Sequence, residues 1–119
     1  MSKYRAVFLD LSPLDQGDLD LTPLQSAFAE LICHTETSET QIVDRLQGAE
    51  VAIVNKVTLS DATLAACPDL KLILVAATGI NNIDLAAAKQ RDIAVCNCQA
   101  YGTATVAQHT LMLLLALAT

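Results

Sequence analysis

Five short apolar runs recur along the chain and predict five buried strands. Each run consists mainly of apolar residues and is followed by polar or turn-forming ones. Near-continuous apolar runs are typical of strands covered on both faces, because neither face of such a strand meets water. The predicted strands comprise residues 4–9, 31–34, 51–54, 72–76 and 93–96.

The segments between these runs carry start and stop signals of helices. Thr22, Pro23 and Gln25 combine an N-cap residue, a proline at the first helical position and a capping-box partner. Ser38 and Gln41 repeat the capping-box pattern. The expected helices cover residues 23–30, the segment from Ser38 to Gly48, residues 61–67 after a Ser60 cap, and residues 84–91.

Strands that alternate with helices at this spacing predict an α/β fold, in which a parallel sheet carries helices on both faces. The expected arrangement is flavodoxin-like, a five-stranded sheet with strand order 2-1-3-4-5. Open sheets of this kind bind ligands at the carboxyl ends of their strands. The residues that follow each strand are therefore the first place to look for a site.

The fourth predicted strand breaks at Thr78 and Gly79 into a polar loop, and a new helix opens at about Asp84. Two consecutive backbone N–H groups in such a loop can hold a small anion without any charged side chain. Lys56, just past the third strand, lies at the same edge of the sheet and is placed to assist anion binding. The alternative for Lys56 is a solvated loop lysine.

The last segment has a different pattern from the rest of the chain. A further capping box, Thr105 to Gln108, starts a helix that is apolar on every side over residues 111–118. Such a helix requires burial all round, and it is far shorter than the roughly 20 residues that span a bilayer. We expect it to lie in a protein interior or interface, in a chain that is part of something larger.

Composition and net charge limit the kinds of molecule that the protein can bind. The chain has 119 residues, enough for one domain, and its hydrophobic share of 53% supports a proper core. A formal charge of −6, without any basic run, argues against nucleic acid and anionic membrane as partners. Asp10 interrupts the first apolar run too early for a secretory signal, so we expect a cytoplasmic protein.

We expect no catalytic or metal site from cysteine or histidine, and leave open only the role of His109, which lies beside the polar break Tyr101 to Thr105. Cys96 and Cys98 form a Cys-x-Cys pair on one face of a predicted strand, but they lack the paired spacing of a zinc site and are expected to be small buried hydrophobes. His34 is expected to be a partly exposed histidine at a loop edge. No spacing ties His34 or His109 to a nucleophile.

Two functions common on flavodoxin-like sheets are excluded, because the chain lacks the residues that they require. A phospho-receiver requires clustered acids after the first strand and an Asp at the end of the third, where this chain has a lone Asp10 and Asn55. A flavin or dinucleotide site requires a glycine-rich or Ser/Thr-rich loop after the first strand. That loop has neither character, and the four glycines are too far apart for G-x-G-x-x-G.

Three motifs together resemble a known family. They are Ala77-Thr78-Gly79-Ile80-Asn81-Asn82-Ile83-Asp84-Leu85, Ile93-Ala94-Val95-Cys96-Asn97 and Tyr101-Gly102-Thr103-Ala104-Thr105-Val106-Ala107-Gln108-His109-Thr110. In this order and spacing they are similar to the D-isomer-specific 2-hydroxyacid dehydrogenases, most of all to the glycerate dehydrogenase (hydroxypyruvate reductase) branch. The resemblance is strong from about Val51 onward and weaker before it.

The resemblance implies a two-domain oxidoreductase that uses NAD or NADP. Residues 1–99 would form most of the substrate-binding domain, and residues 100–119 the hinge and first helix of the dinucleotide-binding domain. Thr78 and Gly79 would seat the carboxylate of a small 2-keto or 2-hydroxy acid, with Tyr101 near the substrate. Thr105 and Val106 would lie near the cofactor, and the 105–119 helix would pack between domains and support a homodimer or higher association.

The family's glycine-rich motif, ribose-binding acid and catalytic Arg, Glu and His have no counterpart in this sequence. By itself the chain is expected to be inactive and to bind no dinucleotide tightly. The alternative hypothesis is a stand-alone flavodoxin-like module that binds small carboxylates or associates with itself through its apolar helix.

Overall fold

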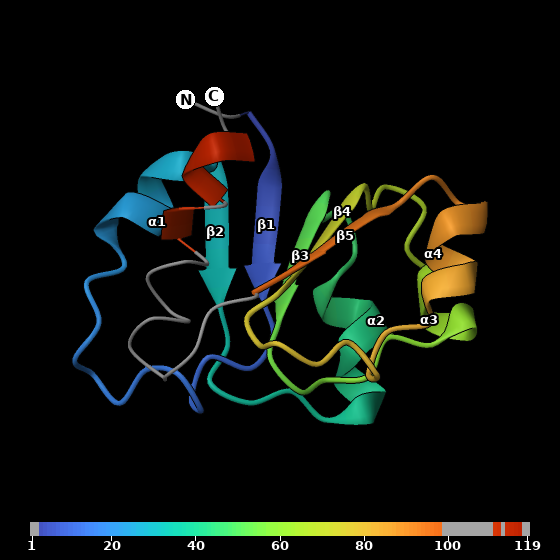
Figure 1. Cartoon of the computed structure of the whole chain (residues 1–119), viewed down its shortest axis with the longest axis horizontal. Coiled ribbons are helices and arrows are strands. Elements are labelled where there is room, and N and C mark those ends of the chain that lie inside the picture. The colour runs from blue at the N-terminus through green and yellow to red at the C-terminus, as the bar shows by residue number, and fades with distance from the viewer. Residues whose placement is uncertain (1–2, 99–110, 113, 118–119) are drawn as a thin grey trace.

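The computed structural model describes residues 3–98, 111–112 and 114–117, and its five strands form one parallel sheet (Figure 1). The order is β2-β1-β3-β4-β5, which confirms the predicted fold class. All four strand pairs are parallel, and β3 is in register with β4 from Val51 opposite Leu72 to Val54 opposite Val75. The strands are β1 Arg5–Phe8, β2 Glu30–Cys33, β3 Val51–Val54, β4 Leu72–Val75 and β5 Ala94–Asn97.

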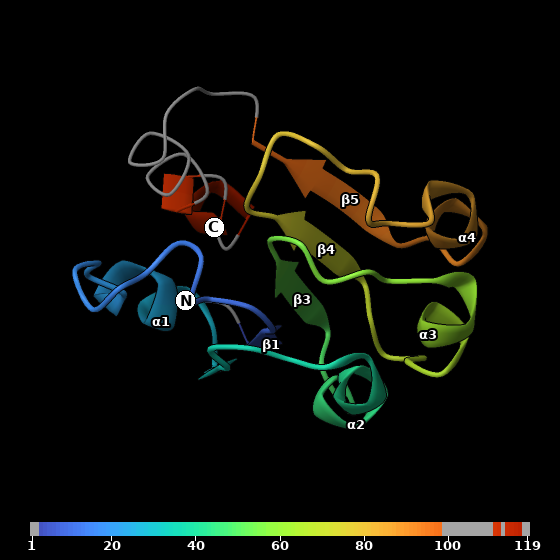
Figure 2. The same ribbon diagram turned by 90° about the horizontal axis from the view of Figure 1, so that it is seen from below.

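Helices cover both faces of the sheet, as Figure 2 shows. Successive strand residues point to opposite sides, and in this sheet both sides carry apolar residues that pack against helices. One hydrophobic cluster joins α2, α3 and α4 to alternate residues such as Ala52 and Val54. The other joins α1 and Leu114 of the last helix to the intervening residues, such as Val51 and Ile53. The helical elements are α1 Thr22–Ala27, η1 Glu39–Gln41, α2 Ile42–Arg45, α3 Asp61–Ala65 and α4 Leu85–Gln90.

The first predicted helix is wrong at both ends. Leu21, rather than Thr22, is the N-cap, and the Thr22 N–H donates to Asp20 Oδ1 at 3.0 Å. The helix ends at Ala27 because the following residues join the sheet: the Ala29 N–H donates to the Tyr4 carbonyl at 3.0 Å. Glu30 therefore begins β2, where the sequence predicted the end of a helix.

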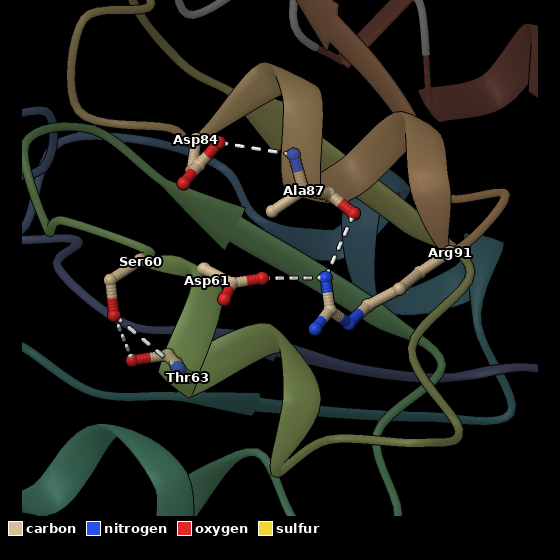
Figure 3. A network of polar contacts seen from close by, with 6 residues as sticks. All are labelled: Ser60, Asp61, Thr63, Asp84, Ala87 and Arg91. Carbon is tan, nitrogen blue, oxygen red and sulfur yellow. Dashed lines mark hydrogen bonds and ion pairs between the residues drawn. The ribbon is translucent and has the colours of Figure 1, made fainter.

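The other helix signals agree better with the structure. Gln41 Oε1 accepts the Ser38 N–H at 3.0 Å, as the capping-box pattern predicts, although the first turn is a 3-10 helix. Figure 3 shows Ser60 Oγ accepting the Thr63 N–H at 3.3 Å and Asp84 Oδ1 accepting the Ala87 N–H at 3.0 Å. Local side-chain signals therefore fix where these helices begin.

An arginine joins the ends of α3 and α4 (Figure 3). Arg91 Nη1 lies 2.8 Å from Asp61 Oδ1 and donates to the Ala87 carbonyl at 3.1 Å. Asp61 is largely exposed, so the ion pair contributes at most about 1 kcal/mol. It links the start of α3 to the end of α4 and adds little to the stability of the fold.

The cysteine pair matches its prediction in part. Cys98 is fully buried, whereas Cys96 is only partly buried and packs against the second cluster. Within the described part of the chain, no group of three or more His, Cys, Asp or Glu residues is arranged to hold a metal ion. The same residues include no helix with the length and hydrophobicity needed to cross a bilayer.

Candidate functional site

The candidate site is a solvent-open hollow at the carboxyl ends of β3 and β4. Its volume is about 310 Å³. The loop after β3 contributes Asn55 and Lys56 to the wall, and the loop after β4 contributes Ala77, Gly79, Asn81 and Asn82. The hollow therefore lies at the sheet edge where parallel sheets bind ligands.

Thr78 and Gly79 are exposed at this edge. The Thr78 carbonyl accepts a hydrogen bond from Asn97 Nδ2 at 2.8 Å, which ties the loop to the end of β5. Within the described part of the chain, neither the Thr78 N–H nor the Gly79 N–H donates to a protein acceptor. Two adjacent donors are thus available to an anion, although their role as a carboxylate seat stays a prediction.

Lys56 and Gly79 line the same hollow, as the sequence led us to expect. The Lys56 side chain is exposed and makes no ion pair with the described residues. A Cβ added at Gly79 would meet no atom within 4 Å, so the packing of the chain does not require glycine there. Its lack of a side chain leaves the backbone open to an approaching ligand.

Asparagines are the part of this wall that the sequence did not indicate. Asn55 is only 8% exposed, and its side-chain amide forms no hydrogen bond within the described part of the chain. Asn82 Nδ2 donates to the Val57 carbonyl at 2.8 Å. A signal was present: a polar Asn directly ends the apolar run of β3, and two more follow Gly79.

Asp10 is a second component of the site that the sequence did not indicate. It follows β1 and is 7% exposed. Asp10 Oδ1 accepts the Asn55 N–H at 2.7 Å, and Oδ2 accepts the N–H groups of Lys56 and Val57 at 2.6 and 3.1 Å. The residue that had argued against a phospho-receiver thus holds the loop after β3.

His34 lies outside the hollow, at the end of β2. It is partly exposed, which confirms the prediction of a loop-edge histidine. Partial burial and then the positive charge of Arg45 lower the pKa of His34, which favours the neutral imidazole. Among the described residues, no acid–base pair lines the hollow.

A second hollow, of about 190 Å³, lies at the opposite end of the sheet between Tyr4, Phe28, Leu72 and Leu114. Its lining is mainly apolar, and its two charged residues, Glu50 and Lys71, pair with each other at 3.5 Å, so the lysine there already has a carboxylate partner. We therefore place the candidate site at the carboxyl edge.

Several predicted residues lie outside the described part of the chain: Tyr101, Thr105, Val106 and His109. Of the last helix, residues 111–112 and 114–117 are described, and all are helical. Leu114 is buried on the sheet, whereas Met112, Leu115 and Leu117 are 58%, 42% and 51% exposed. One side of the apolar helix thus packs on the domain itself, and the other is uncovered.

The open parallel α/β sheet, with a hollow at the carboxyl ends of its strands, places the chain among the α/β domains that bind ligands at that edge. The particular family follows from comparison with known proteins. Residues 7–117 match the family described as D-isomer specific 2-hydroxyacid dehydrogenase, catalytic domain, and the chain belongs to that family. The resemblance inferred from the three sequence motifs is confirmed.

Two relatives illustrate the match. The chain is 45% identical over 106 residues to the glycerate dehydrogenase of Methylorubrum extorquens, which covers 87% of this chain and 34% of that protein. It is 36% identical over 114 residues to the hydroxypyruvate reductase of Blautia hydrogenotrophica, with 93% and 35% covered. The chain spans about a third of the length of these relatives.

Solved structures agree on the fold. The 3-phosphoglycerate dehydrogenase of Entamoeba histolytica, determined with NAD+ bound, superposes with a TM-score of 0.69 at 20% identity. The match covers 81% of this chain and 33% of that one.

Proposed function

We propose that this chain forms the substrate-binding part of an NAD(P)-dependent D-2-hydroxyacid dehydrogenase of the hydroxypyruvate or glycerate type. The observation that supports the proposal is the pair of uncommitted N–H groups at Thr78 and Gly79: Gly79 lines the hollow together with Lys56, and Thr78 adjoins it in the sequence. Family membership and two relatives named for glycerate and hydroxypyruvate support the substrate class.

In this proposal the carboxylate of the acid accepts hydrogen bonds from the Thr78 and Gly79 N–H groups. Lys56 adds a positive charge on the opposite wall of the hollow, and the side-chain amide of Asn55 is available for a hydroxyl or keto oxygen. These groups bind and orient the substrate. None of them is an acid–base pair, so proton transfer belongs to residues outside this sequence.

The residues of this chain do not fit a dinucleotide. The loop after β1 contains no glycine before Gly17, and the sequence contains no G-x-G-x-x-G. We therefore assign NAD or NADP, which would supply the hydride, to the two-thirds of the relatives' length that this chain does not match. The 119-residue chain should not turn over hydroxypyruvate with NADH or NADPH.

Titration of the 15N-labelled chain with D-glycerate tests the carboxylate seat. We expect the Thr78 and Gly79 amide signals to shift with an affinity of about 1 mM or weaker, since the chain supplies only part of a binding site. Glycerol, which lacks the carboxylate, is the control ligand. Equal shifts with glycerol, or shifts elsewhere only, would contradict the proposal.

The Gly79→Val variant tests the same carboxylate seat by blocking it. Its side chain meets open space in the folded chain, so its free energy of unfolding should change by less than about 0.5 kcal/mol. Its isopropyl group would stand beside the amide donors and should remove the D-glycerate shifts. Binding that survives this change would place the ligand elsewhere.

The uncovered side of the last helix favours a second candidate function, self-association. Met112, Leu115 and Leu117 expose apolar surface that a second copy could cover. Sedimentation at several concentrations should show a dimer that Leu115→Glu or Leu117→Glu weakens. A strict monomer at every concentration would exclude this role.

A further inference from the structure

Asp10 joins two strand ends that lie far apart in the sequence. Its two carboxylate oxygens accept the N–H groups of three consecutive residues, Asn55, Lys56 and Val57, over sequence separations of 45 to 47. The residue as a whole is 7% exposed. Both oxygens are committed to the loop, so Asp10 acts on this loop and is not available to a ligand.

Asn82 holds the same loop from its carbonyl side. Its side-chain Nδ2 donates to the Val57 carbonyl at 2.8 Å and lies 3.5 Å from the Asn55 carbonyl. Its own backbone carbonyl accepts the Leu59 N–H at 2.8 Å, and Leu59 pairs with Ile83 in a parallel bridge. The segment after β3 and the segment after Gly79 are therefore bonded at several points.

These contacts decide where Lys56 stands relative to Thr78 and Gly79. The Lys56 side chain has no ion pair in the described part of the chain, so its direction depends on its backbone. That backbone is fixed by Asp10 on one side and by Asn82 on the other. The two walls of the hollow are thus set by one chain of hydrogen bonds that starts at β1.

We propose that Asp10 is a positioning residue of the candidate site. Its carboxylate fixes residues 55–57, and Asn82 transmits that conformation to the loop that carries the Thr78 and Gly79 donors. The proposal rests on the proposed function in one respect only, that the hollow binds a carboxylate. The linkage between the two loops is a property of the free chain and can be tested without a ligand.

The Asp10→Asn variant tests the proposal with little change of shape, because an amide keeps one acceptor oxygen and loses the other. Asp15→Asn is the matched control: Asp15 also accepts three backbone N–H groups, but only from its own exposed turn. In the free chain, Asp10→Asn should shift the amide signals of residues 55–57 and also of 78–83. Asp15→Asn should shift only signals around residues 17–19.

A double-mutant cycle separates positioning from general loosening. In an Asn82→Ala background, Asp10→Asn should shift the Thr78 and Gly79 amides less, because the side-chain link through Asn82 is lost while the main-chain contacts of Leu59 with Asn82 and Ile83 remain. The same shifts in both backgrounds, or no shift at 78–83 in either, would overturn the proposal. If Asp10→Asn does not fold, Asn82→Ala alone must shift Val57, Thr78 and Gly79 for the proposal to stand.

Titration with D-glycerate measures the effect of Asp10 on ligand affinity. We expect Asp10→Asn to weaken binding about fivefold, a coupling typical of residues in one hydrogen-bond network, with Asp15→Asn unchanged. Unchanged affinity in Asp10→Asn overturns the positioning role if the unsubstituted chain binds. If the unsubstituted chain does not bind, the proposed function fails, and the free-chain signals alone decide the linkage.

Discussion

Two aspartates in this chain each accept three backbone N–H groups, and they do so in opposite settings. Asp10 binds residues 45 to 47 positions away and is 7% exposed. Asp15 Oδ1 alone accepts the N–H groups of Gly17, Asp18 and Leu19, at 2.8 to 3.1 Å, in an exposed turn. The chemistry is the same, but one aspartate joins the ends of two strands and the other shapes its own turn.

The difference shows why the number of hydrogen bonds that a residue makes is a poor guide to its contribution to stability. Water can replace Asp15 at its three donors, because the turn lies at the surface. The donors held by Asp10 are largely shielded from water, so losing their acceptor leaves them unsatisfied. The long sequence separation also means that Asp10 holds together segments that nothing local connects.

Replacement of each aspartate by alanine should give the largest contrast. We expect Asp10→Ala to lower the free energy of unfolding by about 3 kcal/mol, because buried N–H groups lose their partners. Asp15→Ala should cost less than about 1 kcal/mol, as is usual for surface changes. Urea denaturation of both variants measures this. Equal losses would show that burial does not separate the two residues.

The Lys56→Met variant separates the contribution of the Lys56 side chain from that of its main chain. The hydrogen bond to Asp10 uses the Lys56 main chain, so the variant should keep the free energy of unfolding within about 0.5 kcal/mol. D-glycerate affinity should fall about twofold to fivefold, because an exposed charge near an anion contributes roughly 1 kcal/mol or less. Titration at low and high salt checks this, since the advantage of lysine should shrink with ionic strength. A stability loss like that of Asp10→Ala would show that the side chain also supports the loop.

The pH dependence of the Asp15 turn gives a smaller, local effect. The backbone hydrogen bond from Leu19 lowers the pKa of Asp15 most, and desolvation opposes it. The hydrogen bonds from Gly17 and Asp18 add to the lowering, so the pKa lies below its ordinary value. A lowered folded-state pKa means that the turn's contribution is present above the unfolded pKa and is lost as pH falls through the folded one. Amide signals of residues 17–19 should therefore move with a midpoint below that of a free aspartate. A midpoint at or above the ordinary value would contradict these bonds.

The same contrast explains what the sequence could predict. The bounds of β3 agree with the prediction, and the Thr78–Gly79 break was found, because a short apolar run and a local polar break are visible in neighbouring residues. The parallel sheet followed from the alternation of elements, and the strand order from the expected flavodoxin-like arrangement. Asp10, by contrast, is a single acid in a loop until the fold brings residue 55 beside it, 45 positions later. Contacts of that range leave no pattern in the nearby sequence.

The error in α1 has a related cause. Helix-start signals are local, but the helix ends where the Ala29 N–H finds the Tyr4 carbonyl in the sheet. Tertiary pairing thus overrides the local tendency of residues 28–30 to continue a helix. Domain boundaries and the roles of Tyr101, Thr105 and Val106 stay predictions.

The smallest expected effect uses Cys33 as a probe of the Asp15 turn. Desolvation and then the negative charge of Asp15 raise the pKa of the Cys33 thiol. Asp15→Asn removes that charge, so the thiolate forms more readily and alkylation by iodoacetamide at pH 8 should become up to about twofold faster. Cys67 is the internal control, because burial alone raises its pKa and its rate should not change. Asp10→Asn should leave the Cys33 rate unaltered, because the charge that raises the pKa of Cys33 is that of Asp15, and the Asp10 carboxylate binds residues 55–57 after β3. If both substitutions accelerated Cys33 equally, the two aspartates would act through a common loosening of the sheet edge, and the distinction between a local and a long-range carboxylate would fail.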